Sequence, residues 1–411
     1  MGDILFRNLA LLDAENGEIR SGCQVLVRDR LIVEIAQGSL TAPKARIVDL
    51  GGRTLMPGLI DCHVHVTAMG RKIPRGTLLP SYVHAHAAEN LRGILMRGFT
   101  TVRDACGADL GHKQSVEQGL IVGPRLFVAG RGISQTGGHG DSRLRGDQTP
   151  VCSCSFFLGH DLARVADGLD EVRQAVRDEI RMGADQIKVM ASGGVGSASD
   201  PIDYIQYSLE EIEAAVDEAA RSHTYVMAHA YTNEAISRAV QAGVRTIEHG
   251  NLLDDEGAKL MAERGAFLVP TLICYHIHQR IGRELGFEPE SLEKSLQVFT
   301  AGTRSLELAK RYGVSMAYGS DLFNSPLEFQ SEEFLVRAAV LSPAEIIRSA
   351  TIVGAEVVRM VGKIGVIAPG AHADLLAVDG NPLEDLAVLQ NQGKHMSMIM
   401  KDGVFYKNTL S

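Results

Sequence analysis

The pattern of hydrophobic and polar positions changes twice along this chain. Near the N-terminus, short apolar runs such as Gln24–Arg28 alternate with turn-forming residues, and runs such as Met396–Lys401 repeat this pattern near the C-terminus. Apolar runs of this length between turn residues are typical of β-strands. Neither end is long enough to bury a core alone, so we expect residues 1–56 and 362–411 to form one small β-sandwich domain together.

Between the two ends, apolar runs of strand length alternate with amphipathic helical segments. Helices are expected at Leu162–Met182 and Leu209–Ser222, and the second opens with a capping box formed by Ser208 and Glu211. Eight strand–helix units over about 300 residues favour the α/β class, with a (β/α)8 TIM barrel at residues 57–361. The expected strands are Leu59–His65, Phe99–Asp104, Arg125–Ala129, Gln186–Met190, Tyr225–His229, Arg245–His249, Phe267–Thr271 and Ser315–Gly319.

Metal-binding residue types stand at the carboxyl ends of these strands, where the active sites of TIM barrels lie. His63 and His65 end the first strand, and residues i and i+2 of a strand face the same side, so both imidazoles would project together. Imidazoles and carboxylates are ligands of zinc and similar metals. The other candidates are Lys188 in strand four, His229 and His249 at the ends of strands five and six, and Asp321 just after strand eight.

Each candidate also has a simpler structural explanation when taken alone. A buried lysine such as Lys188 would pair with a nearby carboxylate to offset its desolvation cost. A single buried histidine is more often a core residue than a ligand, and Asp321, after a glycine, could form a turn or cap a helix. Four histidines at the strand ends of one barrel reverse this judgement and predict a metal centre.

Composition and charge limit the expected partners and location. The 411-residue chain carries a net charge of -9, so it has no basic excess with which to bind nucleic acid. The N-terminus lacks the apolar stretch of a signal peptide, and no run approaches the roughly 18 apolar residues of a membrane span. The six cysteines, including the closely spaced Cys152 and Cys154, show no disulfide framework. We expect a cytoplasmic protein that acts on a small molecule without nucleic-acid or membrane partners, and we also expect a homo-oligomer.

Taken jointly, these motifs resemble the amidohydrolase superfamily. The resemblance rests on Pro57–His65, the strand-four lysine, the two later strand-end histidines and Gly319–Asp321, and the tail Gly365–Pro382 is similar to that family's return strand into the sandwich. Gln135–Asp141 and Ile187–Val195 resemble the imidazolonepropionase-like group. That group includes metal-dependent dipeptidases that cleave Xaa-Pro, and others that cleave Xaa-Arg or Xaa-Lys. The resemblance covers essentially the whole chain.

The resemblance implies a binuclear centre of two divalent metal ions, with zinc the first expectation. It implies that a hydroxide and an N6-carboxylated (carbamate) Lys188 bridge the two metals, and that the hydroxide attacks an amide carbonyl. It further implies that Asp321 takes the proton of the attacking water and returns it to the leaving nitrogen. In this scheme the more buried metal is bound by His63, His65 and Asp321, and the more exposed one by His229 and His249.

Two loop residues are candidates for contacts to substrate. His139 follows strand three in a glycine-rich loop, and Tyr231 stands two residues beyond His229, so either could donate a hydrogen bond to the carbonyl oxygen or to a substrate carboxylate. A loop histidine and a packing tyrosine are the simpler alternatives. Because the ligand set is already full, we expect Tyr275–His278 to be pocket wall or plain loop.

The favoured function is a zinc-dependent Xaa-Pro dipeptidase (prolidase) that also acts on N-acyl-proline. One alternative is an Xaa-Arg/Xaa-Lys dipeptidase or carboxypeptidase, whose pocket would need acidic side chains such as Asp141, Asp147 or Glu248. Another is a cyclic-amide hydrolase of the imidazolonepropionase type, although a single-metal site would not need a bridging Lys188. Hydrolysis of lactones or esters on the same centre is a further alternative. The last is a non-catalytic relative that keeps the barrel as a binding or scaffold module, although such proteins lose ligands and here every expected ligand position is filled.

Overall fold

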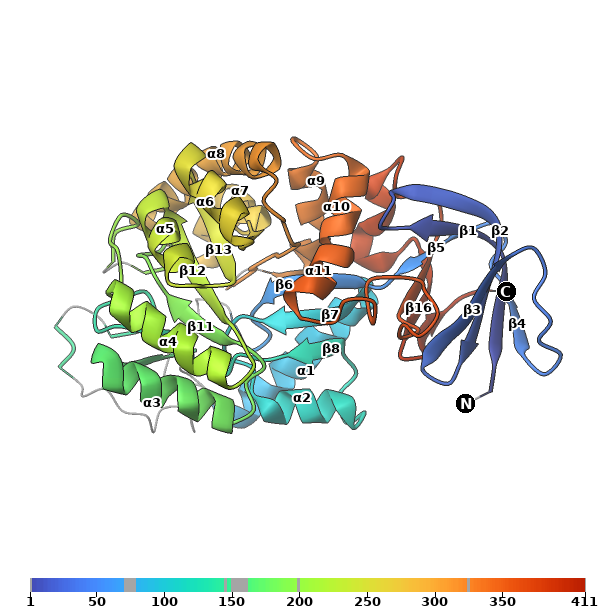
Figure 1. Cartoon of the computed structure of the whole chain (residues 1–411), viewed down its shortest axis with the longest axis horizontal. Coiled ribbons are helices and arrows are strands. Elements are labelled where there is room, and N and C mark those ends of the chain that lie inside the picture. The colour runs from blue at the N-terminus through green and yellow to red at the C-terminus, as the bar shows by residue number, and fades with distance from the viewer. Residues whose placement is uncertain are drawn as a thin grey trace.

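The chain folds into two parts that Figure 1 shows side by side, parallel strands among helices at one end and a sheet holding both termini at the other. This structure is a computed structural model, which describes residues 2–69, 79–143, 146–148, 162–197, 200–323 and 326–410. Cys152 and Cys154 lie outside the described residues.

Both ends of the chain build one eight-stranded sheet in the order β17-β16-β15-β5-β1-β2-β3, with β4 paired to β1. The rings of Phe6 in β1 and Phe405 in β17 lie 6.4 Å apart. Four strand spacings of a flat sheet would separate them by about 19 Å, so the sheet folds over on itself around a buried apolar core. The strands are β1 (Ile4–Asp13), β2 (Glu18–Arg28), β3 (Leu31–Gln37), β4 (Arg46–Asp49), β5 (Thr54–Pro57), β15 (Leu375–Val378), β16 (Met396–Lys401) and β17 (Val404–Asn408).

This sheet confirms the predicted β domain built from both termini, whereas the boundaries at residues 57 and 362 stay a prediction. The domain also positions the first strand of the site. β5 pairs with β15 in the terminal sheet, and the chain passes through Gly58 directly into β6 (Leu59–Val64), which carries His63.

The middle of the chain contains parallel strands in two sheets, β6-β7-β8 and β10-β9-β11-β12-β13-β14. Backbone hydrogen bonds join the two sheets on both sides. On one side, the Asp185 amide before β11 donates to the Val128 carbonyl after β8 (2.7 Å). On the other, the segment after α8 (Pro289–Tyr312) links β14 to β6, because Met316 bridges to Leu268 and the Cys62 amide donates to the Tyr318 carbonyl (2.8 Å). The α/β class with parallel strands is confirmed, and these links are consistent with a TIM barrel. The strands after β6 are β7 (Phe99–Asp104), β8 (Arg125–Phe127), β9 (Gly132–Ser134), β10 (Ala163–Val165), β11 (Ile187–Met190), β12 (Val226–Thr232), β13 (Thr246–Leu252) and β14 (Phe267–Val269).

The helices lie between successive strands and cover the parallel sheets (Figure 1). The predicted capping box is present at the start of α4, where Ser208 Oγ accepts from the Glu211 amide and the Glu211 side chain accepts from the Ser208 amide. The helices are α1 (Pro80–Met96), α2 (Leu110–Glu117), α3 (Gly168–Arg181), α4 (Leu209–Arg221), α5 (Asn233–Gln241), α6 (Asp255–Arg264), α7 (Leu272–Leu285), α8 (Pro289–Tyr312), α9 (Glu333–Arg337), α10 (Pro343–Ser349) and α11 (Ile352–Val357).

Three predicted elements differ from the structure. The eighth strand, expected at Ser315–Gly319, is reduced to the single bridge at Met316. The helix expected from Leu162 begins only at Gly168, because the preceding residues pair with β9 as a strand too short to show a periodic pattern. The segment Tyr275–His278, expected as loop or pocket wall, lies inside α7.

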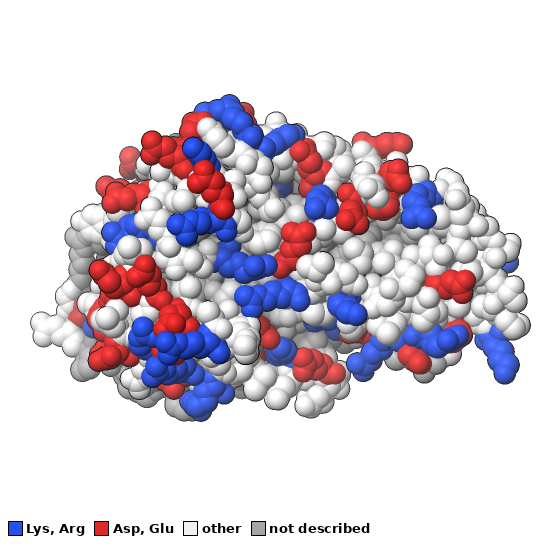
Figure 2. All heavy atoms as spheres, in the orientation of Figure 1, with Lys and Arg blue, Asp and Glu red and all other residues white. Residues whose placement is uncertain are grey.

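Figure 2 shows the charged side chains on one face of the molecule. On this face, lysine and arginine side chains are interspersed with aspartate and glutamate. Among the described residues, no helix is both long and apolar enough to cross a membrane.

Candidate metal centre

The six candidate ligands gather among the parallel strands, and none is more than 9% exposed. Lys188 is the second residue of β11 (Ile187–Met190), so it does not lie at the carboxyl end of that strand. His63, His229 and His249 lie in β6, β12 and β13, and Lys188 lies within β11. His65 follows β6, and Asp321 follows the bridge at Met316. These two residues complete the group.

One carboxylate collects the imidazoles of the first strand. Asp321 Oδ1 lies 3.4 Å from His63 Nε2 and 3.2 Å from His65 Nε2, so both imidazoles face the same oxygen, as their i, i+2 spacing predicts. Ligand atoms of His63, His249 and Asp321 all lie within 4.8 Å of one another. Buried imidazole nitrogens and a carboxylate oxygen at this spacing fit a divalent cation such as zinc.

His229 and Lys188 border this cluster. The rings of His229 and His249 have centroids 4.7 Å apart. Lys188 is 2% exposed, and in the part of the chain that the structure describes its ammonium has neither a hydrogen bond nor an ion pair. The carboxylates of Glu248 and Asp321 are near enough to raise the pKa of Lys188 against the larger effect of burial, which lowers it, but neither forms an ion pair with its ammonium.

The histidines of the cluster are held mainly in the neutral form, which is the form that binds metals. Burial lowers the pKa of His63, His229 and His249 well below the usual value, and the charge of Lys188 lowers each pKa further. His65 differs, because the nearby Cys106 and the hydrogen bond with Asp321 raise its pKa despite burial.

Glu248, which forms a buried ion pair with Arg103, fixes the orientation of His63. Its Nδ1 lies 2.7 Å from Glu248 Oε2, and since a carboxylate only accepts, Nδ1 carries the proton and Nε2 is left for a metal. The other oxygen of Glu248 accepts from Arg103 at 2.9 Å and from Thr246 Oγ1 at 2.6 Å. His65 is oriented in the same way, because its Nδ1 donates to the Cys106 carbonyl at 2.9 Å.

The strand ends next to His249 are conformationally strained. His249, Thr271 and Asp321 adopt positive φ angles of 75°, 47° and 44°, which non-glycine residues rarely do and which is least favourable for the β-branched threonine. His249 Nδ1 lies 2.8 Å from Thr271 Oγ1 and 3.0 Å from the Tyr275 hydroxyl. Strain of this kind concentrates at functional sites, where surrounding contacts hold it.

The two candidate substrate residues both lie against the cluster. The His139 ring stacks on His229 with centroids 4.3 Å apart, and its Nδ1 donates to the buried Asp200 carboxylate at 3.1 Å. The ring covers Gly194 so closely that any Cβ there would overlap it. Tyr231 stacks on His249, with ring centroids 5.1 Å apart.

A second buried carboxylate ties the ends of the site together. Asp61 accepts from the His63 amide at 3.0 Å, from Ser320 Oγ at 2.6 Å and from Gln330 Nε2 at 2.8 Å. Burial raises the pKa of Asp61 to about 6, against the opposing effect of these donors. Asp61 thereby holds Ser320, and hence Asp321, beside His63.

Sequence reasoning missed the residues that orient the candidate ligands. The signal available was adjacency in the chain, since Glu248 directly precedes one candidate ligand and Asp61 stands two residues before another. Glu248 was instead considered as part of a pocket for basic substrates, and its complete burial against His63 and Arg103 makes that interpretation wrong. The other missed residues are Arg103, Asp200 and Thr271, and Tyr275, expected only as pocket wall or loop, contacts His249.

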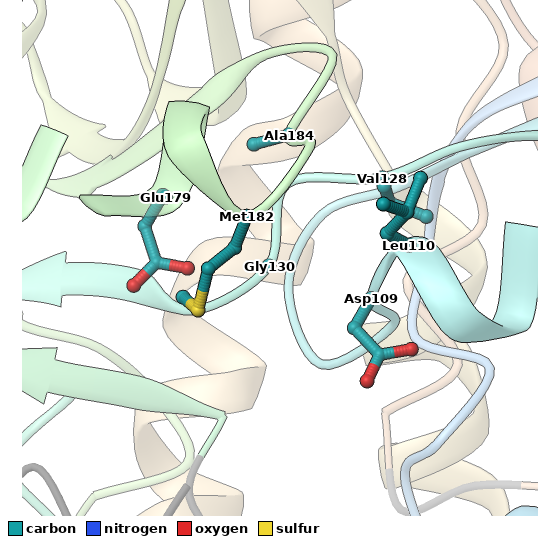
Figure 3. Close-up of a pocket in the computed structure, with 7 residues that line it drawn as sticks. All are labelled: Asp109, Leu110, Val128, Gly130, Glu179, Met182 and Ala184. Atoms are coloured by element: carbon teal, nitrogen blue, oxygen red, sulfur yellow. The ribbon is translucent and has the colours of Figure 1, made fainter. Parts of the chain in front are cut away.

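A small cavity lies apart from the cluster (Figure 3). It has a volume of about 10 Å³, enough for no more than about one water, and none of the candidate ligands lines it. Its lining includes Asp109 and Glu179, which come from the loop before α2 and from α3. This cavity is too small to bind a substrate.

Known proteins resemble this chain over nearly its full length. Residues 54–405 match the amidohydrolase family. An ochratoxinase from Aspergillus niger is 32% identical over 97% of this chain and 85% of its own, and an imidazolonepropionase from Paraburkholderia phymatum is 26% identical over 66% and 64%. A prolidase solved with N-methylphosphonate-L-proline is 48% identical (TM-score 0.95), and a Xaa-Pro dipeptidase solved with bound methionine is 30% identical (TM-score 0.90), each over 99% of this chain and 100% of its own. The chain belongs to the amidohydrolase family, and its relatives include those that its motifs predicted.

Proposed function

We propose that this amidohydrolase is a binuclear, zinc-dependent Xaa-Pro dipeptidase that also cleaves N-acyl-proline. The observation that carries the proposal is the buried cluster in which His63, His65 and His249 surround Asp321 beside a buried Lys188. A cytoplasmic location and a homo-oligomeric state stay predictions.

The proline preference is supported by likeness to a solved relative. The prolidase that is 48% identical to this chain was solved with a methylphosphonate attached to L-proline. A tetrahedral phosphonate on a proline nitrogen has the shape of the species formed when water adds to an N-acyl-proline carbonyl, and sites complementary to such species favour the corresponding reaction. We carry that substrate class over to this chain as part of the proposal.

The donor set suggests how two metals would be shared. His63, His65 and Asp321 would hold one ion and His229 and His249 the other, with Lys188 between them as a carbamate. A carbamate would give Lys188 a negative charge among cations, which accounts for a buried lysine without a carboxylate partner. When bound, the metals would lower the pKa of water and polarise the amide carbonyl.

The side chains of the site would handle protons and orientation. The pKa of Asp321 is lowered although burial opposes this, because His63 and the hydrogen bond from His65 stabilise its carboxylate. An ionised Asp321 can accept the proton of the attacking water and return it to the leaving nitrogen. Tyr231, which borders His249, would donate a hydrogen bond to the carbonyl oxygen as negative charge develops on it. His139, which borders His229 and directs its Nδ1 proton to Asp200, would donate from Nε2 as an imidazolium.

The structure offers little support for a pocket selecting basic C-terminal residues. Asp141 is 9% exposed and pairs with Arg143 at 2.6 Å, and Glu248 is committed to His63 and Arg103. Neither carboxylate is available to a lysine or arginine of the substrate.

Hydrolysis of a dipeptide panel by zinc-loaded protein tests this function. Xaa-Pro, Xaa-Arg, Xaa-Lys and neutral C-terminal dipeptides are compared with N-acyl-proline at equal concentration. Turnover concentrated on Xaa-Pro and N-acyl-proline supports the proposal. Preferential turnover of the basic series would overturn the proline assignment, and inactivity on every amide with two metals bound would overturn the reaction class.

A further inference from the structure

Tyr275 joins Tyr231 to a candidate metal ligand through its hydroxyl group. The Tyr275 oxygen lies 2.7 Å from the Tyr231 oxygen and 3.0 Å from His249 Nδ1. Tyr275 is 1% exposed and projects from the first turn of α7, whereas Tyr231 is 3% exposed and lies in β12. The strands β12 and β13 and the helix α7 thus meet in one buried row of polar atoms.

The protons available on these polar groups give the row of hydrogen bonds a direction. Thr271 Oγ1 and the Tyr275 hydroxyl both lie against His249 Nδ1, and Asp321 Oδ2 lies 3.8 Å from the same nitrogen. If a metal is held by the other nitrogen, Nε2, the proton of the neutral ring must sit on Nδ1. Nδ1 then donates to Tyr275 or to Thr271. In either case a protonated Nδ1 cannot accept a hydrogen bond, so Tyr275 directs its own proton to Tyr231, which leaves the Tyr231 hydroxyl proton for another acceptor.

We propose that Tyr275 is a positioning residue that orients and polarises the Tyr231 hydroxyl toward the carbonyl oxygen of the substrate. The inference rests on the proposed amide hydrolysis and extends it to a residue outside the ligand set. A metal on His249 would draw electron density from the ring, and hydrogen bonds in a buried chain strengthen one another in the same sense. The hydroxyl that meets the developing oxyanion would therefore be a stronger donor than an isolated tyrosine.

The packing around Tyr231 supports this role. Its ring stacks on His249 with an interplanar angle of 22° and meets His229 edge-on with centroids 4.9 Å apart. These contacts fix the ring beside two candidate ligands, but they leave the hydroxyl hydrogen free to rotate. The hydrogen bond to Tyr275 removes that freedom, which is the contribution that a positioning residue makes.

A double-mutant cycle tests the proposal, with Tyr231→Phe, Tyr275→Phe and the double variant measured on the fastest substrate of the panel. We expect kcat to fall on the order of 100-fold for Tyr231→Phe and about 10-fold for Tyr275→Phe, with KM little changed. The double variant should be no slower than Tyr231→Phe, because Tyr275 acts through Tyr231. Tyr207→Phe is the matched control, since it removes a buried hydroxyl that bonds the Ala166 carbonyl outside the site.

Metal content and binding of N-methylphosphonate-L-proline provide readouts that do not depend on turnover. Tyr275→Phe should keep its metals, because His249 Nδ1 retains Thr271 as a partner, and should bind the phosphonate more weakly than wild type. Multiplicative losses of kcat in the double variant would overturn the proposal, as would loss of metal in Tyr275→Phe, which would place its role at His249. If proline substrates prove wrong, the cycle still runs on the amide that wild type cleaves, so the two failures are distinguishable.

Discussion

Replacing Glu248 by glutamine tests whether the buried ion pair beneath the site sets its metal affinity. Glu248 is completely buried and bonds His63 through one oxygen and Arg103 through the other. A glutamine has one acceptor and one donor in the same positions. The glutamine must therefore turn its amide N–H either toward the Nδ1–H of His63 or toward the Arg103 guanidinium. In each case two hydrogen-bond donors face each other.

The expected losses follow from these two contacts. Removing one partner of a buried ion pair costs about 3–5 kcal/mol of folding stability, because the remaining charge is left unpaired. Losing the carboxylate that orients a histidine ligand costs roughly 10–100-fold in metal affinity. Glu248→Gln should therefore bind zinc roughly 10–100-fold more weakly than wild type. It should also unfold at a lower urea concentration.

Titration against a chromophoric zinc chelator measures the affinity, and Glu179→Gln is the matched control. Glu179 is 1% exposed and pairs with Arg131 at 3.0 Å, but it lines the small cavity of Figure 3 away from the histidine cluster. The control should lose stability and keep wild-type zinc affinity. Equal zinc affinity in Glu248→Gln and wild type, or an equal loss in both variants, would refute the reasoning.

Three further changes test other parts of the site. Lys188→Ala should lose bound metal and activity, and short carboxylic acids should restore part of both; full activity with two metals per chain would rule out the carbamate. Gly194→Ala should displace the His139 ring and lower kcat on the order of 100-fold, whereas Gly196→Ala, where a Cβ meets no atom within 4 Å, should not. Burial raises the pKa of Asp104 from 3.8 to about 6, so the folded state binds this proton more tightly and its stabilising effect is lost as pH rises. Urea unfolding should show wild type losing up to about 3 kcal/mol relative to Asp104→Asn between about pH 4 and pH 6, and a pH-independent difference would contradict this.

The sequence predicted the elements whose pattern is local. Period-two spacing indicated that His63 and His65 would face one partner, and both lie within 3.4 Å of Asp321 in the structure. The capping box at Ser208 likewise needs only four consecutive residues and is present. Residues before Gly168 were assigned to a helix because a three-residue strand carries too little periodicity.

The residues that orient the candidate ligands could not be predicted, because their contacts join distant parts of the chain. His63 and Glu248 are 185 positions apart, and Arg103 and Glu248 are 145 apart. Tyr275 was assigned to pocket wall or loop because the ligand set seemed complete without it. Its position in the first turn of α7, one turn after the strained Thr271, depends on how β14 ends and not on any pattern around Tyr275.

The number of metals bound per chain tests the central claim most directly. Elemental analysis of protein stripped with a chelator and then titrated with zinc should show two ions bound per chain, with amide hydrolysis absent before titration and restored as the second ion binds. Full hydrolysis by metal-free protein, or saturation at one ion with full activity, would contradict the binuclear centre proposed for His63, His65, Lys188, His229, His249 and Asp321.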